Sequence, residues 1–169
     1  MRTDYEEATA LCLKVDMRGC KELREATWIE WWNKGLTAAD LATLAKLGAV
    51  LPALEGLDLM EPSGSAGPDG VPRLAEGLFA GSLPAVTVLS LDSMHVGDAG
   101  ASGIAAALDR GTLPRLKGLA LVNAAIGDAG LAALAPALRR RPALKHLCLG
   151  ANPFATTLRP GDFAPVPRP

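Results

Sequence analysis

Leucines and other apolar residues recur along this chain in a fixed pattern, L-x-x-L-x-L, in which small or polar residues separate the apolar ones. Alternation with a period of two residues predicts a short β-strand with one buried face. The pattern starts near residues 26, 54, 86, 116 and 144, at spacings of 28, 32, 30 and 28 residues. Such an internal period predicts a repeat protein, in which each unit packs on its neighbours.

Turn and helix signals recur between these strands. A proline lies two residues before four of the five starts, and residues 97–100 and 127–130 share the sequence G-D-A-G. Proline cannot continue a helix and favours extended backbone before it, so it marks the return from helix to strand. Leu131, Leu134 and Leu138 follow the second G-D-A-G at helical spacing. Each unit is therefore expected to be a strand, a turn and a helix, with Asp or Thr capping the helix.

These motifs closely resemble the ribonuclease-inhibitor-like class of leucine-rich repeats, whose units follow L-x-x-L-x-L-x-x-N-x-I/L-G-D-x-G-x-x-x-L. The resemblance covers residues 26–153 and implies an α/β fold. The implied shape is a short curved horseshoe with parallel strands on its concave face and helices on its convex face. In the family the asparagine forms a hydrogen-bonded ladder between turns. Here only Asn152 matches it, and the other four positions hold Lys34, Pro62, Met94 and Ala124.

The segments outside the repeats are expected to be a cap and a tail. Apolar residues in 1–25 fit one face of a helix but also alternate as in a strand, so both interpretations stay open. In either form this segment is expected to cover the apolar edge of the first repeat. Residues 154–169 are rich in proline, which predicts an extended or disordered tail. The helical face in the first segment would comprise Ala8, Leu11, Cys12 and Val15.

Composition and charge narrow the class of protein. The net charge of -1 argues against a nucleic-acid-binding protein. The charges are unevenly distributed, because residues 1–84 hold eight basic and thirteen acidic side chains, whereas residues 85–169 hold nine and five. The first residues are charged, and no stretch of about 18 apolar residues occurs, so neither a signal peptide nor a membrane segment is predicted. A soluble, cytoplasmic protein is expected.

The cysteines do not predict a disulfide framework or a zinc site. They number three, and no C-x-x-C or C-x-x-H spacing occurs, so Cys12, Cys20 and Cys148 are predicted to be free thiols. Cys148 and His146 share one strand face, which would suit a thiolate nucleophile, but no third residue is placed to orient them. Solitary thiols are therefore the preferred interpretation.

Two further motifs have a structural interpretation that outweighs a functional one. The G-D-A-G turns lack the lysine of a phosphate-binding loop and the spacing of a dinucleotide site. Arg139, Arg140 and Arg141 lie at a predicted helix C-terminus, where the helix dipole favours positive charge. This structural interpretation outweighs a phosphate or nucleic-acid site. No catalytic, metal or cofactor site is predicted, and the protein is not expected to be an enzyme.

The clearest candidate site lies on the predicted concave surface, to which residues between the inward leucines point. Its N-terminal half is expected to be aromatic and acidic, and tryptophan is enriched among residues that dominate protein interfaces. Two alternatives stay open: the tryptophans form a packing stripe of a helix or cap together with Trp31, and the acids form only a solvated face. The predicted partner-binding residues are Trp28, Glu30, Trp32, Asp58, Met60, Glu61 and Asp92.

The function expected from these features is that of a non-enzymatic protein–protein interaction module. Its concave face is predicted to bind a protein partner of basic character, with no cofactor, nucleic acid or membrane involved. Two other hypotheses are an accessory or activator of a small GTPase and a fragment of a larger leucine-rich-repeat receptor or sensor. No residue can be matched to a GTPase-activating role. The partner and the oligomeric state do not follow from the sequence.

Overall fold

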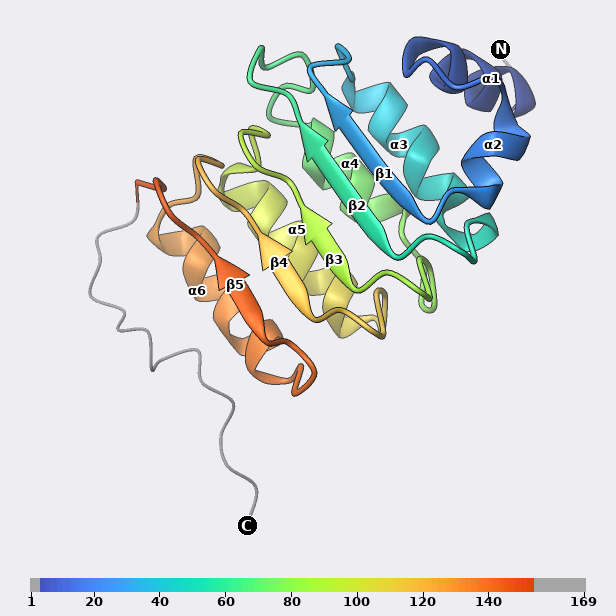
Figure 1. The fold of residues 1–169 in the computed structure, drawn as a ribbon. Coiled ribbons are helices and arrows are strands. Elements are labelled where there is room, and N and C mark those ends of the chain that lie inside the picture. The colour runs from blue at the N-terminus through green and yellow to red at the C-terminus, as the bar shows by residue number, and fades with distance from the viewer. Residues whose placement is uncertain (1–3, 154–169) are drawn as a thin grey trace.

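The computed structural model describes residues 4–153, in which helices and strands alternate along the chain. Two helices come first, then four strands that are each followed by a helix, and a fifth strand is the last element of the described residues (Figure 1). The predicted proline-rich tail, residues 154–169, lies outside the described residues. In chain order the elements are α1 (Asp4–Lys14), α2 (Cys20–Glu25), β1 (Trp28–Trp32), α3 (Ala38–Leu47), the 3-10 turn η1 (Gly48–Val50), β2 (Gly56–Met60), α4 (Gly70–Gly77), β3 (Val88–Ser90), α5 (Gly97–Asp109), β4 (Gly118–Ala120), α6 (Asp128–Arg139) and β5 (His146–Cys148).

Within residues 4–153 the five strands form one parallel sheet whose order follows the chain. The first outward position of each predicted repeat lies opposite that of the next, which confirms the expected register. In β1 to β4 the residue after this position is apolar and buried. The α/β fold with parallel strands is thus confirmed. The aligned outward residues are Trp28, Gly56, Val88, Gly118 and His146.

The helices that follow the strands lie together on one side of the sheet and leave the other side uncovered (Figure 1). We call the uncovered side, predicted to be concave, the open strand face. α3 packs against α4, α4 against α5, and α5 against α6. Small residues set this close spacing, because a Cβ atom added at Gly77 would lie 2.6 Å from the Cβ atom of Ala45. Real Cβ contacts are longer than this, so larger residues would push the helices apart.

The first segment of the chain is helical, and the strand interpretation of residues 1–25 is wrong for the part that the structure describes. Leu11 and Cys12 are buried on one side of α1, whereas Leu13, which a strand would place with Leu11, is exposed. α1 packs against α3, and an ion pair of 2.6 Å joins Lys14 Nζ to Asp40 Oδ2. The two N-terminal helices therefore lie against the first repeat (Figure 1).

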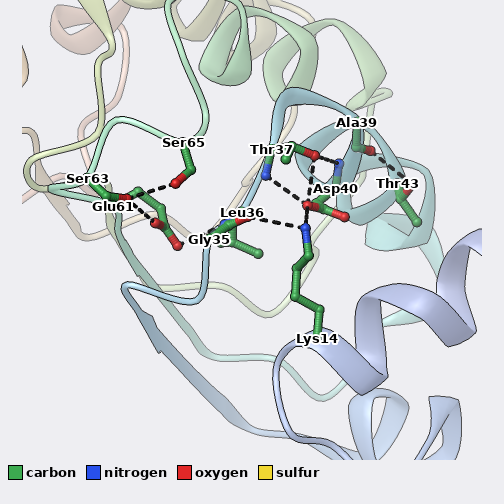
Figure 2. Close-up of polar contacts among 10 residues, drawn as sticks. All are labelled: Lys14, Gly35, Leu36, Thr37, Ala39, Asp40, Thr43, Glu61, Ser63 and Ser65. Carbon is green, nitrogen blue, oxygen red and sulfur yellow. Dashed lines mark hydrogen bonds and ion pairs between the residues drawn. The ribbon is translucent and has the colours of Figure 1, made fainter.

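α3 begins with the kind of cap that the turn pattern predicts. Thr37 Oγ1 accepts a hydrogen bond from the backbone N–H of Asp40 at 3.3 Å, and Asp40 Oδ2 accepts one from the backbone N–H of Thr37 at 2.8 Å (Figure 2). This reciprocal pair satisfies donors that a helix start leaves free. Burial raises the pKa of Asp40, but the hydrogen bonds from Lys14 and Thr37 outweigh burial and lower this pKa below its ordinary value.

The aspartate of the G-D-A-G turn has a different role from the one its position predicts. Asp98 Oδ1 accepts hydrogen bonds from the backbone N–H groups of Gly127 at 2.7 Å and Gly130 at 2.9 Å. Both donors lie at the start of α6, so Asp98 caps the helix of the following repeat. A Cβ atom at Gly130 would lie 2.6 Å from the accepting oxygen. The second glycine of the motif is therefore needed for this close approach.

Candidate functional site

The open strand face of β1 displays two tryptophans. Trp28 is 47% exposed and Trp32 is 57% exposed, whereas Trp31 between them is 3% exposed and lies in the core. This alternation is that of a strand with one buried face. A helical packing stripe formed by all three tryptophans is therefore excluded. Two half-exposed indoles on one strand are large apolar surfaces without a covering element in the described chain.

Trp28 lies across the neighbouring strand. A Cβ atom added at Gly56, the residue opposite Trp28 in β2, would overlap the six-membered ring of the Trp28 indole. The absence of a side chain at Gly56 therefore makes room for the indole, which packs on the β2 backbone. An aromatic side chain held in this way has little conformational entropy left to lose when a partner binds.

Acidic side chains accompany the tryptophans. Glu30 lies between Trp28 and Trp32 on β1 and is exposed, and Asp58 lies opposite Glu30 on β2 and is half-buried. Asp58 Oδ1 is fully buried and has no hydrogen-bond partner among the described residues. A buried carboxylate oxygen without a donor costs free energy. Met60, opposite Trp32, is half-buried beside these groups.

Glu61 is a correction to the predicted site. Its side chain is 1% exposed, so it does not belong to the open strand face. Glu61 Oε1 accepts a hydrogen bond from the backbone N–H of Leu36 at 3.0 Å, and Oε2 accepts one from the Ser63 hydroxyl at 3.2 Å (Figure 2). In a later repeat Asn152 Oδ1 accepts from Ile126 N–H, which holds the same repeat position as Leu36. Glu61 thus replaces the missing ladder asparagine of its repeat.

Asp92 also has a structural partner. Its Oδ1 accepts a hydrogen bond of 2.7 Å from the backbone N–H of Val122, in the segment that follows β4. The carboxylate therefore joins the ends of two neighbouring strands, and it is half-buried. The residues that the structure leaves together and accessible on the open strand face are Trp28, Glu30, Trp32, Asp58 and Met60.

A hollow of about 430 Å³ lies where the strands end, and Glu61, Ser93 and His95 are among its lining residues. Ser93 has a positive φ of 54°, which in some hydrolases marks a nucleophile. Asn33, Asn123 and Ala151, at equivalent positions, have φ values of 49°, 51° and 55°. The backbone conformation is therefore a property of the repeat turn. The Ser93 hydroxyl accepts a hydrogen bond from the Asn123 amide and is not paired with a base.

The other candidates for chemistry gain no partners. His146 and Cys148 are both exposed on β5, and no third group among residues 4–153 is recorded as joining them. Among residues 4–153, no group of three His, Cys, Asp or Glu side chains is placed to hold a metal ion. One pair of cysteines that the sequence spacing did not single out does come together, Cys12 with Cys20. The eight-residue separation has no recognised meaning, so only the fold could reveal this pair.

The arginine run at the end of α6 is engaged within the protein. The Arg141 guanidinium donates hydrogen bonds to the backbone carbonyl oxygens of Leu108, in the last turn of α5, and of Thr112 and Leu113, just after it. Arg140 forms an ion pair of 2.8 Å with Asp109. Carbonyl groups at a helix C-terminus lack intrahelical partners and attract cations. The structural interpretation of Arg140 and Arg141 therefore accounts for their placement, with a neighbouring helix as the partner.

Comparison with known proteins shows a likeness in structure. No family model and no curated protein sequence matches the chain. A solved structure described as the leiomodin-1 actin-binding site 2 is similar, with a TM-score of 0.54 and 18% sequence identity. The match covers 68% of this chain and 62% of that one, so the chain spans less than two thirds of the matched structure.

No helix within residues 4–153 has the length and apolarity needed to cross a membrane. The helices instead alternate with five parallel strands, whose starts recur every 28 to 32 residues in the sequence. At 18% identity the leiomodin-1 match bears on the fold alone. Together, the repeat, the sheet order and this match identify the fold of the chain as that of a leucine-rich-repeat protein.

Proposed function

We propose that this protein is a non-enzymatic interaction module whose open strand face binds a protein partner through Trp28 and Trp32. The observation that supports this proposal is the pair of half-exposed indoles on β1, next to the unpartnered carboxylate oxygen of Asp58. The matched structure is described as an actin-binding site, which is a precedent for protein binding by a similar fold. The kind of partner that this chain binds is inferred from the chemistry of the open strand face.

The surface chemistry favours a basic segment. The outward positions of β1 and β2 include Glu30 and Asp58 and contain no basic residue. A lysine or arginine side chain can lie against an indole face and be attracted by its ring electrons. Its N–H groups can also donate to the half-buried Asp58 carboxylate, and hydrogen bonds between charged groups are stronger than neutral ones. One basic side chain would therefore satisfy both the aromatic surface and the carboxylate.

The two kinds of residue are expected to act on different rates. A tryptophan that a partner buries is typically worth about 2 kcal/mol or more, which corresponds to roughly 30-fold in affinity and is lost mainly as faster dissociation. Exposed acidic groups mainly steer encounter, and salt weakens this contribution. Glu30 and Asp58 should therefore govern the salt dependence of association, and the tryptophans should govern dissociation.

A display library of random peptides, selected against the full chain, would test the proposal. Selected peptides should be enriched in lysine and arginine and should change the fluorescence of the exposed tryptophans on binding. Trp28→Ala and Trp32→Ala should each weaken the best peptide by roughly 30-fold. Asp58→Asn should flatten the dependence of the association rate on salt. Phe79→Ala removes an exposed aromatic residue outside the open strand face and should leave binding unchanged.

Two results would count against the proposed site. Selected peptides without a basic preference would remove the argument from charge. Tryptophan variants that bind as well as the unmodified protein, but unfold at much lower temperature, would show that the indoles only pack against the sheet. Circular dichroism of each variant distinguishes this second result from a loss of binding.

A further inference from the structure

The N-terminal helices bring together two thiols that have no part in the proposed protein-binding function. Cys12 lies near the end of α1 and Cys20 is the first residue of α2. The Cys12 thiol donates a hydrogen bond to Cys20 Sγ, with 3.8 Å between the sulfur atoms. We propose that Cys12 and Cys20 are a redox-active pair that forms a reversible disulfide bond between α1 and α2. This proposal is independent of the proposed binding function.

The two sulfur atoms differ in accessibility, which assigns their order of reaction. Cys12 is fully buried, whereas Cys20 is half-buried and lines a surface pocket of about 490 Å³ with Leu23, Val50 and Pro52. Burial, and next the neighbouring Cys20 thiol, raise the pKa of Cys12 to about 11. A thiol must lose its proton to attack. Cys20 is therefore the sulfur that meets an external oxidant, and Cys12 is the sulfur that completes the bond.

Closing the bond requires only local movement. A disulfide has an S–S distance of about 2.05 Å, so the sulfur atoms must approach by a little under half of their present separation. α2 is six residues long, and it is preceded by Gly19, whose φ of 156° and ψ of -179° are accessible mainly to glycine. α1 is held more firmly, by its packing on α3 and by the ion pair of Lys14 with Asp40. The movement is therefore assigned to α2.

The chemistry is an exchange with a small-molecule disulfide, of which oxidised glutathione is an example. The Cys20 thiolate attacks one sulfur of that disulfide, forms a mixed disulfide and releases one small thiol. Cys12 then loses its proton and attacks the Cys20 sulfur, which forms the Cys12–Cys20 bond and releases the second small thiol. The cysteine pair gives up two electrons and two protons, and the small disulfide takes up both. Excess reduced thiol reverses the reaction.

The test uses the full chain with Cys148→Ser, which removes the exposed third thiol. The protein is equilibrated with oxidised and reduced glutathione under native conditions, quenched with acid, alkylated and analysed by mass spectrometry. The expected product has lost two hydrogens and yields a peptide linking Cys12 to Cys20. Because the second thiol is already at the reaction site, this product should exceed the Cys20 mixed disulfide by at least about tenfold. In the unmodified protein, Cys148 should form a mixed disulfide with glutathione and no bond to Cys12 or Cys20.

Two variants complete the test. Cys20→Ser should abolish the linked peptide, and because Cys20 is only half-buried this variant should retain the circular dichroism of the unmodified protein. Cys12→Ser should instead trap the mixed disulfide on Cys20. A folded Cys148→Ser protein that accumulates the mixed disulfide, or that stays fully reduced in oxidised glutathione, would overturn the proposal.

Discussion

Replacing Glu61 separates its structural role from the binding role that its sequence position suggested. Glu61→Gln keeps the volume and an oxygen that can accept from the Leu36 N–H, and its amide can donate to the Ser63 hydroxyl oxygen. Glu61→Ala removes both partners. Both variants lack the charge, so neither has a carboxylate to remove from water on folding. The difference in stability between them therefore isolates the hydrogen bonds and the packing.

The magnitude follows from the contacts. Leu36 is fully buried, so its backbone N–H would be left without an acceptor in Glu61→Ala, at a cost of about 1–3 kcal/mol. The loss of the one buried methylene group at Cγ adds about 0.8 kcal/mol. Glu61→Ala should therefore be less stable than Glu61→Gln by roughly 3 kcal/mol, which for a chain of this size corresponds to a difference in Tm of roughly 10 °C.

Urea unfolding followed by circular dichroism measures this difference directly. Glu76→Ala, which removes an exposed carboxylate from α4, should change the free energy of unfolding by less than about 0.5 kcal/mol and serves as the control. Binding of a selected basic peptide should be the same for Glu61→Gln and the unmodified protein. If the two Glu61 variants are equally stable and both bind the peptide poorly, the assignment of Glu61 to the core is wrong.

Two further predictions concern the helix starts. Asp98→Ala should lower the free energy of unfolding by about 1–2 kcal/mol in urea, because two N–H groups of α6 lose their acceptor. Asp69→Ala, at the start of α4, should have little effect, since Asp69 makes no side-chain cap. The pKa of Asp40 is lower in the folded protein than its ordinary value of 3.8. Its contribution to stability is therefore complete at pH values above 3.8 and is lost as the pH falls through the folded pKa. Acid titration of unfolding should show this component in the unmodified protein and not in Asp40→Asn; equal acid sensitivity of the two would disprove it.

The architecture could be predicted from the sequence because several independent signals mark the same repeat. The leucine spacing, the prolines and the G-D-A-G turns each fixed the same phase, so the outward residues of neighbouring strands were aligned correctly from Trp28 to His146. The choice between helix and strand in the first segment failed to resolve for lack of this redundancy. Leu11 and Val15 fit both periods, and only packing against α3 distinguishes them.

The candidate site was less predictable, since it depends on which polar atoms find partners. Trp28 and Trp32 were placed on the strand face by alternation alone. Glu61 was misplaced because a substitute for the ladder asparagine can come from a neighbouring position, one residue before the motif predicts. The orphaned oxygen of Asp58 and the approach of Cys12 to Cys20 are properties of three-dimensional placement. No spacing rule in a single sequence encodes them.

The cap that Asp98 places on α6 affects how the chain can unfold. Because the acceptor belongs to one repeat and the donors belong to the next, α6 cannot keep its start ordered after the preceding turn opens, and the preceding turn cannot open without exposing two N–H groups of α6. This interface therefore couples the order of the third and fourth repeats, in the manner of a one-dimensional cooperative lattice. A deletion that removes one whole repeat together with its caps would preserve this coupling, whereas a deletion of the same length that begins within a turn would break the coupling at two interfaces.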